Sequence, residues 1–266
     1  MIGLAHLVVM FGFLVVGIAL LLVVLWPTAR SGPRLLRNWG VAQATQEQGR
    51  LARLYLLERR VLYVVFLVLA VPLDLLTSLY SGRAYFSYVG WLLFALLAAE
   101  AIAVLRPVRG QVRVATLARR RVGDVLPRWM MAAHLVMVVA AAAVMTVVGV
   151  EGNLPDAWVA VAEVVASAAA VYAAAWCAVA RPARSDAELD RALRLRSARV
   201  PIGLGTMFAA TVLGAALSIL GDWQHSADLG VIALFVQGIG LVLWGVMVSV
   251  SAFWMGFRGQ VPAGNG

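Results

Sequence analysis

Apolar residues occur along this chain in long runs, neither alternating with polar residues nor confined to one face at helical spacing. At a rise of about 1.5 Å per residue, a run of about twenty residues can cross a hydrocarbon layer of roughly 30 Å. Such runs cover residues 2–26, 61–80, 85–105, 129–150, 157–180, 200–220 and 229–254. The pattern predicts an all-α fold, a polytopic membrane bundle of seven transmembrane helices that forms a single integral membrane domain.

Arginine is distributed unevenly among the segments between these runs. The segments 28–60, 106–128 and 181–199 carry seven, seven and six arginines, whereas the other side of the predicted membrane has Arg83 alone. Retained loops concentrate basic residues on the cytoplasmic side. We therefore expect these three segments to be cytoplasmic loops, with the N-terminus outside and the C-terminus in the cytoplasm. The first run has no basic segment before it and exceeds a signal-peptide core in length, so we expect a retained helix.

The segment 106–129 contains seven arginines and resembles a nucleic-acid-binding arm when taken alone. Its flanks are apolar runs, and two other segments on the same side carry almost as many arginines. Attraction to anionic headgroups, at roughly 1 kcal/mol per arginine, is sufficient to explain this charge. We expect the partner of these loops to be the lipid bilayer and not nucleic acid.

Composition agrees with a membrane protein and removes several kinds of chemistry. Hydrophobic residues make up 63% of the 266 residues and charged residues 13%, whereas soluble domains are nearer half apolar and a quarter charged. All 22 basic residues are arginine, which excludes a lysine Schiff base to retinal or pyridoxal phosphate and a P-loop lysine. The single cysteine, Cys177, excludes an intrachain disulfide and a thiolate zinc site within one chain. We predict no cofactor and no metal. The arginine, alanine and valine usage is typical of a GC-rich bacterial genome, and so favours a bacterial plasma membrane.

The inner ends of three predicted spans share a proline followed closely by arginine, at Pro27, Pro107 and Pro182. Proline ends a helix and arginine anchors it at the headgroups, so a local role explains the pattern. A parallel repeat of helix hairpins is the alternative.

Two inner segments have helical signals. Ser185 with Glu188 fits a capping box, and Asp190 with Arg194 fits an i,i+4 pair, which together predict a short surface helix over 186–199. Residues 41–60 are expected either to extend the second span into the cytoplasm or to lie along the interface.

Small residues recur at spacing four in the fifth and sixth spans and predict closely packed faces. We expect these two faces to meet within one chain, with contact to a second copy or another membrane protein as the alternative. The members are Ala162, Ala166, Ala170, Ala174 and Ala178, and then Thr206, Ala210, Gly214 and Ser218.

Five ionisable residues within the predicted spans are the candidate site. Acids in hydrocarbon are costly when charged and mark functional sites or packing contacts. Glu100 and His134 fall at a similar depth near the inner face, where a contact between them is geometrically reasonable, whereas Glu163, Asp74 and His6 form an outer tier. We predict a polar path for protons or ions along these residues; the alternative is that each merely fixes packing. His6 and His134 lie too far apart in depth for a shared haem.

The function predicted from these features is a small-solute or ion transporter. A non-catalytic membrane subunit or scaffold of a larger complex is the second hypothesis. An intramembrane enzyme acting on a lipid or isoprenoid is the third, disfavoured because the sequence has no DxxD or HExxH motif. We predict no catalytic residues.

Overall fold

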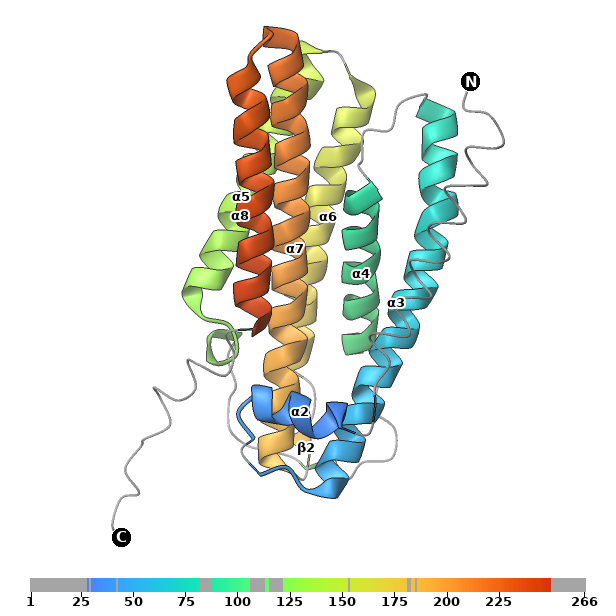
Figure 1. Cartoon of the computed structure of the whole chain (residues 1–266), viewed down its shortest axis with the longest axis vertical. Helices are drawn as coiled ribbons and strands as arrows, with labels where there is room; N and C mark the ends of the chain where they lie inside the picture. Colours follow the sequence, from blue (N-terminus) through green and yellow to red (C-terminus); the bar gives the residue numbers. More distant parts are fainter. Residues whose placement is uncertain are drawn as a thin grey trace.

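The computed structural model describes residues 28, 30–41, 43–81, 88–105, 113–114, 122–152, 154–180, 183–184 and 186–249. Its helices are α2 (Ser31–Asn38), α3 (Gln46–Ser81), α4 (Tyr88–Leu105), α5 (Arg128–Glu151), α6 (Pro155–Ala180), α7 (Ala187–Gln224) and α8 (Ala227–Ser249), with a short 3-10 turn η1 (Val122–Asp124). A two-residue antiparallel bridge joins β1 (Arg113–Val114) to β2 (Ala183–Arg184). Figure 1 shows the long helices side by side in one bundle. The predicted all-helical fold class is confirmed.

Four of the described helices, α5 to α8, are long and apolar enough to cross a membrane. A shorter apolar stretch, Leu92–Val104, lies within α4. The predicted second span lies within α3, whereas the first span, 2–26, falls outside the described residues. These helices are compatible with a membrane protein, and the count of seven spans, like the orientation of the termini, stays a prediction.

The outer surface of α5, α6 and α8 exposes large apolar side chains, among them Leu234 and Phe235, which are 70% and 69% exposed. Such a surface is costly in water and favourable in lipid. Two exposed tryptophans on α6, Trp158 and Trp176, lie eighteen residues apart, or about 27 Å along a helix. Tryptophan concentrates at membrane interfaces, so this pair matches a hydrocarbon layer of about 30 Å.

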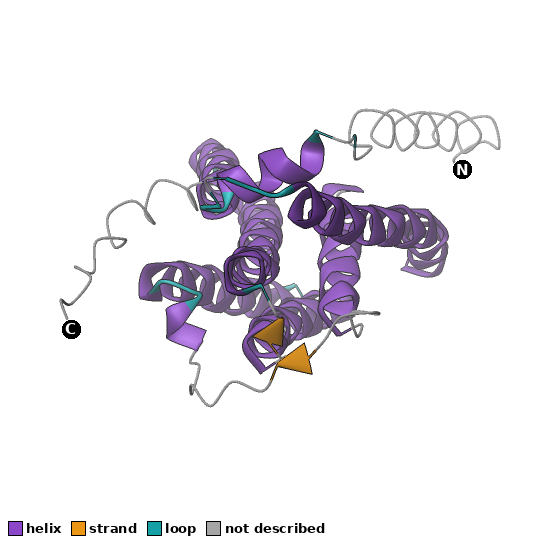
Figure 2. Cartoon of the chain, turned by 90° about the horizontal axis from the view of Figure 1, so that it is seen from below, coloured by secondary structure: helices purple, strands orange, loops and turns teal. Residues whose placement is uncertain are grey.

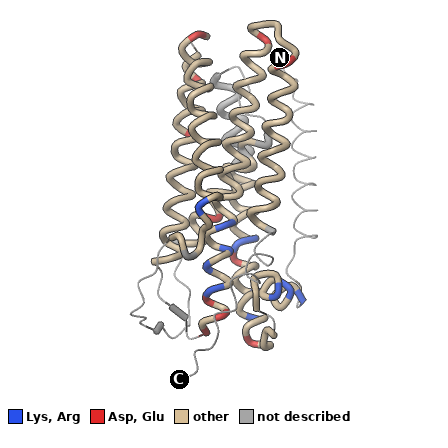
Figure 3. The backbone as a smooth tube through the Cα atoms, turned by 90° about the vertical axis from the view of Figure 1, so that its left-hand side faces the viewer, with Lys and Arg blue, Asp and Glu red and all other residues tan. Residues whose placement is uncertain are grey.

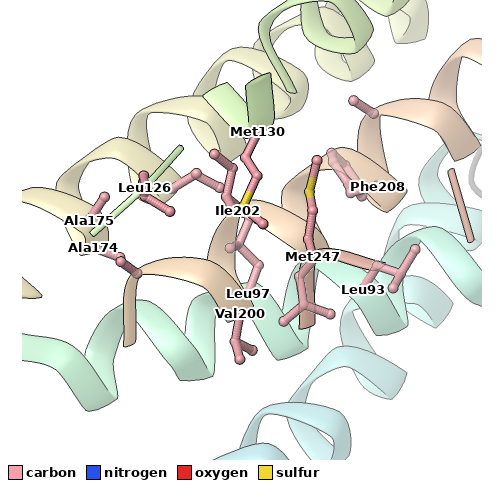
Figure 4. Close-up of a cluster of buried hydrophobic side chains, with 14 of the residues drawn as sticks. Leu93, Leu97, Leu126, Met130, Ala174, Ala175, Val200, Ile202, Phe208 and Met247 are labelled. Carbon is pink, nitrogen blue, oxygen red and sulfur yellow. The ribbon is translucent and has the colours of Figure 1, made fainter. Parts of the chain in front are cut away.

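Helix α7 lies at the centre of the bundle and packs against α4, α5, α6 and α8. Figure 2 shows the bundle end-on, and Figure 4 shows side chains of all five helices converging. Phe208 and Ile202 of α7 are fully buried, and the Phe208 ring lies 5.7 Å from the ring of Phe94 on α4. Among the four candidate spans, α7 is therefore the helix most shielded from the surroundings of the bundle.

The prediction of a separate surface helix over 186–199 is wrong. Residues 187–199 form the first part of α7, which continues through Pro201 without a break, and most of their side chains are buried. Asp186 caps the helix by accepting a hydrogen bond from the backbone N–H of Leu189 at 3.0 Å, while Ser185 of the predicted capping box lies outside the described residues. A proline inside a helix removes one backbone hydrogen bond, and packing against the surrounding helices outweighs that loss here.

The predicted pair of Asp190 and Arg194 is confirmed, with Nε of the arginine 2.7 Å from the carboxylate. The pair is buried, not on the surface. Nη1 of Arg194 also donates to the carbonyls of Ala178 and Val179, each at 2.9 Å. These carbonyls belong to the last turn of α6, whose carbonyls have no partner within the helix. Arg194 therefore holds the C-terminal end of α6 against α7.

Helix α3 begins at Gln46, so most of 41–60 continues the predicted second span as one helix, and its position in the cytoplasm stays a prediction. Its first turn has a reciprocal capping box that the sequence reading did not use. The N–H of Thr45 donates to Gln48 Oε1 at 2.8 Å, and the N–H of Gln48 donates to Thr45 Oγ1 at 3.2 Å. The Gln48 side-chain amide also donates to the carboxylate of Asp186, which ties the start of α3 to the start of α7.

The small-residue face of α7 is closely packed, as predicted, but its partner is α8 and not α6. A Cβ at Gly240 of α8 would lie 2.4 Å from Cβ of Ala210, and Gly214 of α7 meets the side chain of Gln237. On α6, Ala162 and Ala166 are exposed. The buried stripe of α6 instead alternates spacings of three and four, which keeps one side of a helix toward its neighbours. Its members are Ala157, Ala160, Val164, Ser167, Val171, Ala174 and Ala178.

Candidate functional site

Arginine positions gather at one end of the described bundle, whereas acidic positions occur at both ends (Figure 3). At this end Glu100 of α4 is fully buried, and Arg59 of α3 is almost fully buried. Nη1 of Arg59 forms an ion pair with Glu100 Oε2, and Nη1 of Arg196 of α7 lies 3.6 Å from Glu100 Oε1. The Tyr63 hydroxyl donates a hydrogen bond to the same carboxylate. One carboxylate thus joins three helices.

Tyr55 of α3 lies against both arginines of this cluster. The guanidinium carbon of Arg59 is 4.4 Å from the Tyr55 ring centre, and that of Arg196 is 5.3 Å away. Cations over an aromatic face are stabilised by the ring quadrupole. The Tyr55 hydroxyl accepts from Arg196 Nη1 at 3.3 Å, and Ser197 Oγ accepts from Arg59 Nη2 at 3.0 Å. We refer to Tyr55, Arg59, Tyr63, Glu100, Arg196 and Ser197 as the arginine cluster.

The arginine cluster lies at the inner boundary of the predicted membrane. Arg59 lies two residues before the predicted span 61–80, and Arg196 lies four residues before the predicted span 200–220. Burial removes water from the Arg59 guanidinium and lowers its pKa from the usual value. Arginine nevertheless stays protonated in proteins, so the charges persist and must be balanced by neighbouring groups.

Glu100 and His134 have different partners, so the contact predicted between them is not formed. His134 is fully buried, with Nδ1 at 3.3 Å from Thr206 Oγ1 and its ring 5.6 Å from the Tyr172 ring. The prediction assumed that helices consecutive in the chain are neighbours in space. Instead α4 packs against α3, α6 and α7, while α5 packs against α6 and α7. The other ring nitrogen of His134, Nε2, is buried without a hydrogen-bond partner among the described residues.

Of the predicted outer tier, the structure describes only the Glu163 side chain. This carboxylate is partly buried in α6 and, within the described part of the chain, has neither a hydrogen bond nor an ion pair. Asp74 lies in α3, but its side chain falls outside the described residues, as does all of His6. Whether the five candidates form one path stays a prediction.

The sequence reading missed Arg59 and Arg196, because it treated every arginine near the membrane as an orientation signal. A signal was present in the spacing of Tyr55, Arg59 and Tyr63, which lie four residues apart and therefore on one side of a helix. An aromatic–arginine–aromatic stripe entering an apolar run indicates a buried counter-charge on another helix. The sequence alone does not say that this counter-charge is Glu100.

Across the described ranges, no three residues of the histidine, cysteine, aspartate or glutamate types are placed to share a metal ion. Comparison of the chain with protein-family models, with curated proteins and with solved structures finds no match. The functional conclusion therefore depends on the residues themselves.

Proposed function

We propose that this protein is a small-solute or ion transporter of a bacterial plasma membrane, oriented with its N-terminus outside and its C-terminus in the cytoplasm. In this proposal Glu163 is the proton- or cation-binding carboxylate toward the outer side, and Glu100 marks the inner end of the path. Asp74, His134 and His6 are the further polar groups that such a path would use.

Glu163 is the observation that carries this proposal. A carboxylate within a membrane span costs several kcal/mol when charged, and proteins usually offset that cost with a partner. Glu100 has such partners, whereas Glu163 has none in the described bundle. A carboxylate left unpaired at this position can exchange a proton or hold a cation without first breaking an ion pair.

The second candidate function is a non-catalytic subunit of a membrane complex. It is favoured by a shallow apolar groove on α8, lined by Leu234, Phe235, Gly238 and Val242 among others. A Cβ at Gly238 would meet no atom within 4 Å, so another helix could approach there closely. Copurification of one fixed partner from the native membrane, together with no flux from the isolated chain, would favour this function over transport.

Proton flux into proteoliposomes tests the transport proposal. The purified chain is reconstituted with an entrapped pH-sensitive dye, and a potassium gradient with valinomycin sets the membrane potential. We expect flux above that of protein-free vesicles, and we expect Glu163→Gln to reduce it to near their level. Glu151→Gln is the matched control, because Glu151 is exposed at the outer end of α5.

Flux equal to that of protein-free vesicles, or equal flux from the wild-type chain and Glu163→Gln, would contradict the proposal. Glu100→Gln is a weaker test, because it leaves Arg59 and Arg196 without the carboxylate that balances them. A loss of flux in that variant would not separate transport from folding.

A further inference from the structure

The arginine cluster and the neighbouring Arg60 carry more positive than negative charge. Three guanidinium groups, those of Arg59, Arg60 and Arg196, accompany one buried carboxylate, that of Glu100. Exposed Glu58 lies on the same helix and offsets at most one further charge. At least one positive charge is therefore unmatched within this part of the described structure.

Arg60 is the arginine of this group for which the described residues provide no ion pair. Its Nη1 atom is buried, yet it has no hydrogen-bond partner among the described residues. Loss of water lowers the pKa of Arg60, and the positive charge of Arg196 lowers it further, while Tyr63 raises it. The side chain as a whole is only partly buried, so a ligand can approach its exposed part from outside the bundle, and a rotation of the guanidinium would bring Nη1 to it.

This arrangement is costly unless an anion completes it. Like charges in surroundings of low dielectric repel strongly, and a buried donor without an acceptor adds to the cost. Phosphate oxygens suit the planar fork of a guanidinium, which can donate two parallel hydrogen bonds to them. The predicted position, at the cytoplasmic boundary of the bilayer, is where both lipid phosphates and dissolved phosphate are present.

We propose that Arg60, together with Arg196 and Arg59, binds a phosphate group from the cytoplasmic side. Arg60 supplies the free donor, and the other two arginines supply a positive field held in place by Glu100 and Tyr55. The phosphate belongs either to an anionic lipid headgroup or to a free phosphate ion. The site rests on the orientation in the proposed function and shares Glu100 with the proposed path, but the binding of phosphate does not require any flux.

Two binding measurements on the full chain distinguish the sources of phosphate. The first records native mass spectra of the protein in detergent with equal amounts of phosphatidylglycerol and phosphatidylcholine. The second records the binding of inorganic phosphate by isothermal titration, against chloride at equal ionic strength. Each is made on the wild-type chain, on Arg60→Gln and on Arg50→Gln. Arg50 is a matched control, since it is an exposed arginine in the first part of the same helix.

We expect Arg60→Gln to weaken binding of one of the two probes about tenfold or more, because one charge-assisted donor is lost. Arg50→Gln should bind as the wild-type chain does. If Arg60→Gln weakens only the binding of phosphatidylglycerol, the site binds a lipid headgroup. If it weakens only the binding of inorganic phosphate, the site binds a free ion. Arg60→Lys keeps the charge without the fork, so we expect intermediate binding. If Arg60→Gln does not fold, the binding measured for Arg60→Lys tests the proposal in its place.

Two results would overturn the proposal. The first is that neither probe binds the wild-type chain more tightly than it binds the Arg60 variants. The second is that Arg50→Gln weakens binding as much as Arg60→Gln does. Such a result would show that the surface charge as a whole, and no particular site, attracts the anion.

Discussion

The contact between α7 and α8 makes a sharp prediction for Gly240→Ala. The added Cβ would lie 2.4 Å from Cβ of Ala210, whereas two such carbons are in favourable contact at about 3.5 to 4.0 Å. The helices would therefore have to separate by about 1.1 to 1.6 Å, the difference between these distances. The Ala210 Cβ is bonded directly to the backbone, so no side-chain rotation relieves the clash.

The expected loss of stability is about 2 kcal/mol. Overpacking a closely packed interior costs roughly 1–3 kcal/mol, and a clash between two Cβ atoms belongs at the upper end of that range. Replacing glycine with alanine in a helix recovers about 1 kcal/mol. The free energy of unfolding can be measured by titrating dodecyl maltoside micelles with sodium dodecyl sulfate while following tryptophan fluorescence.

Gly238→Ala is the control, since it makes the same chemical change two residues away where no atom lies within 4 Å. We expect that variant to be unchanged or stabilised by up to about 1 kcal/mol. Combining Gly240→Ala with Ala210→Gly should restore most of the lost contact, because it moves the methyl group from one helix to the other. Equal stability of the two alanine variants, or no recovery in the double variant, would refute the close approach of α7 and α8.

Two further predictions concern the arginine-rich end. Arg194→Met should lower the free energy of unfolding by about 3 kcal/mol in the same titration, because it removes the charge partner of buried Asp190 and the donors to the last turn of α6. Arg191 is exposed, so Arg191→Met should change the free energy of unfolding by less than about 0.5 kcal/mol. The second prediction concerns the orientation of the chain in the membrane. Cys177→Ser removes the native thiol, and a single cysteine is then introduced at exposed Gly123 or at exposed Gln224. A membrane-impermeant maleimide added to intact cells should label the second and not the first, and the reverse pattern would invert the proposed topology.

The bounds of α5 and α6 were the part of the fold that the sequence predicted best, whereas α3 and α7 extend well beyond the predicted spans. The apolar runs 129–150 and 157–180 correspond closely to α5 (Arg128–Glu151) and α6 (Pro155–Ala180). The thickness of the hydrocarbon layer fixes how many apolar residues are needed, so the ends of such a run mark the ends of the span. Nothing comparable fixes which helices lie next to each other, and for that reason the contact between Glu100 and His134 was predicted and is not formed.

The charged start of α7 could not be placed from the sequence because charge and exposure are correlated only on average. Asp190 and Arg194 look like surface residues, but each satisfies the other, and the arginine also satisfies carbonyls at the end of α6. A charged residue can be buried when its partners are buried with it. The carbonyls that accept from Arg194 lie on a different helix, and the sequence does not show which one.

The central position of α7 has a consequence for how the protein is made. Synthesis runs from the N-terminus, so α4, α5 and α6 are complete before the helix that all three pack against exists. Until α7 emerges from the ribosome, Glu100 lacks Arg196 and His134 lacks Thr206. During this interval Glu100 has only its partners on α3, and His134 lacks its contact with Thr206, so chaperones and quality-control proteases then have the best chance to act on the chain.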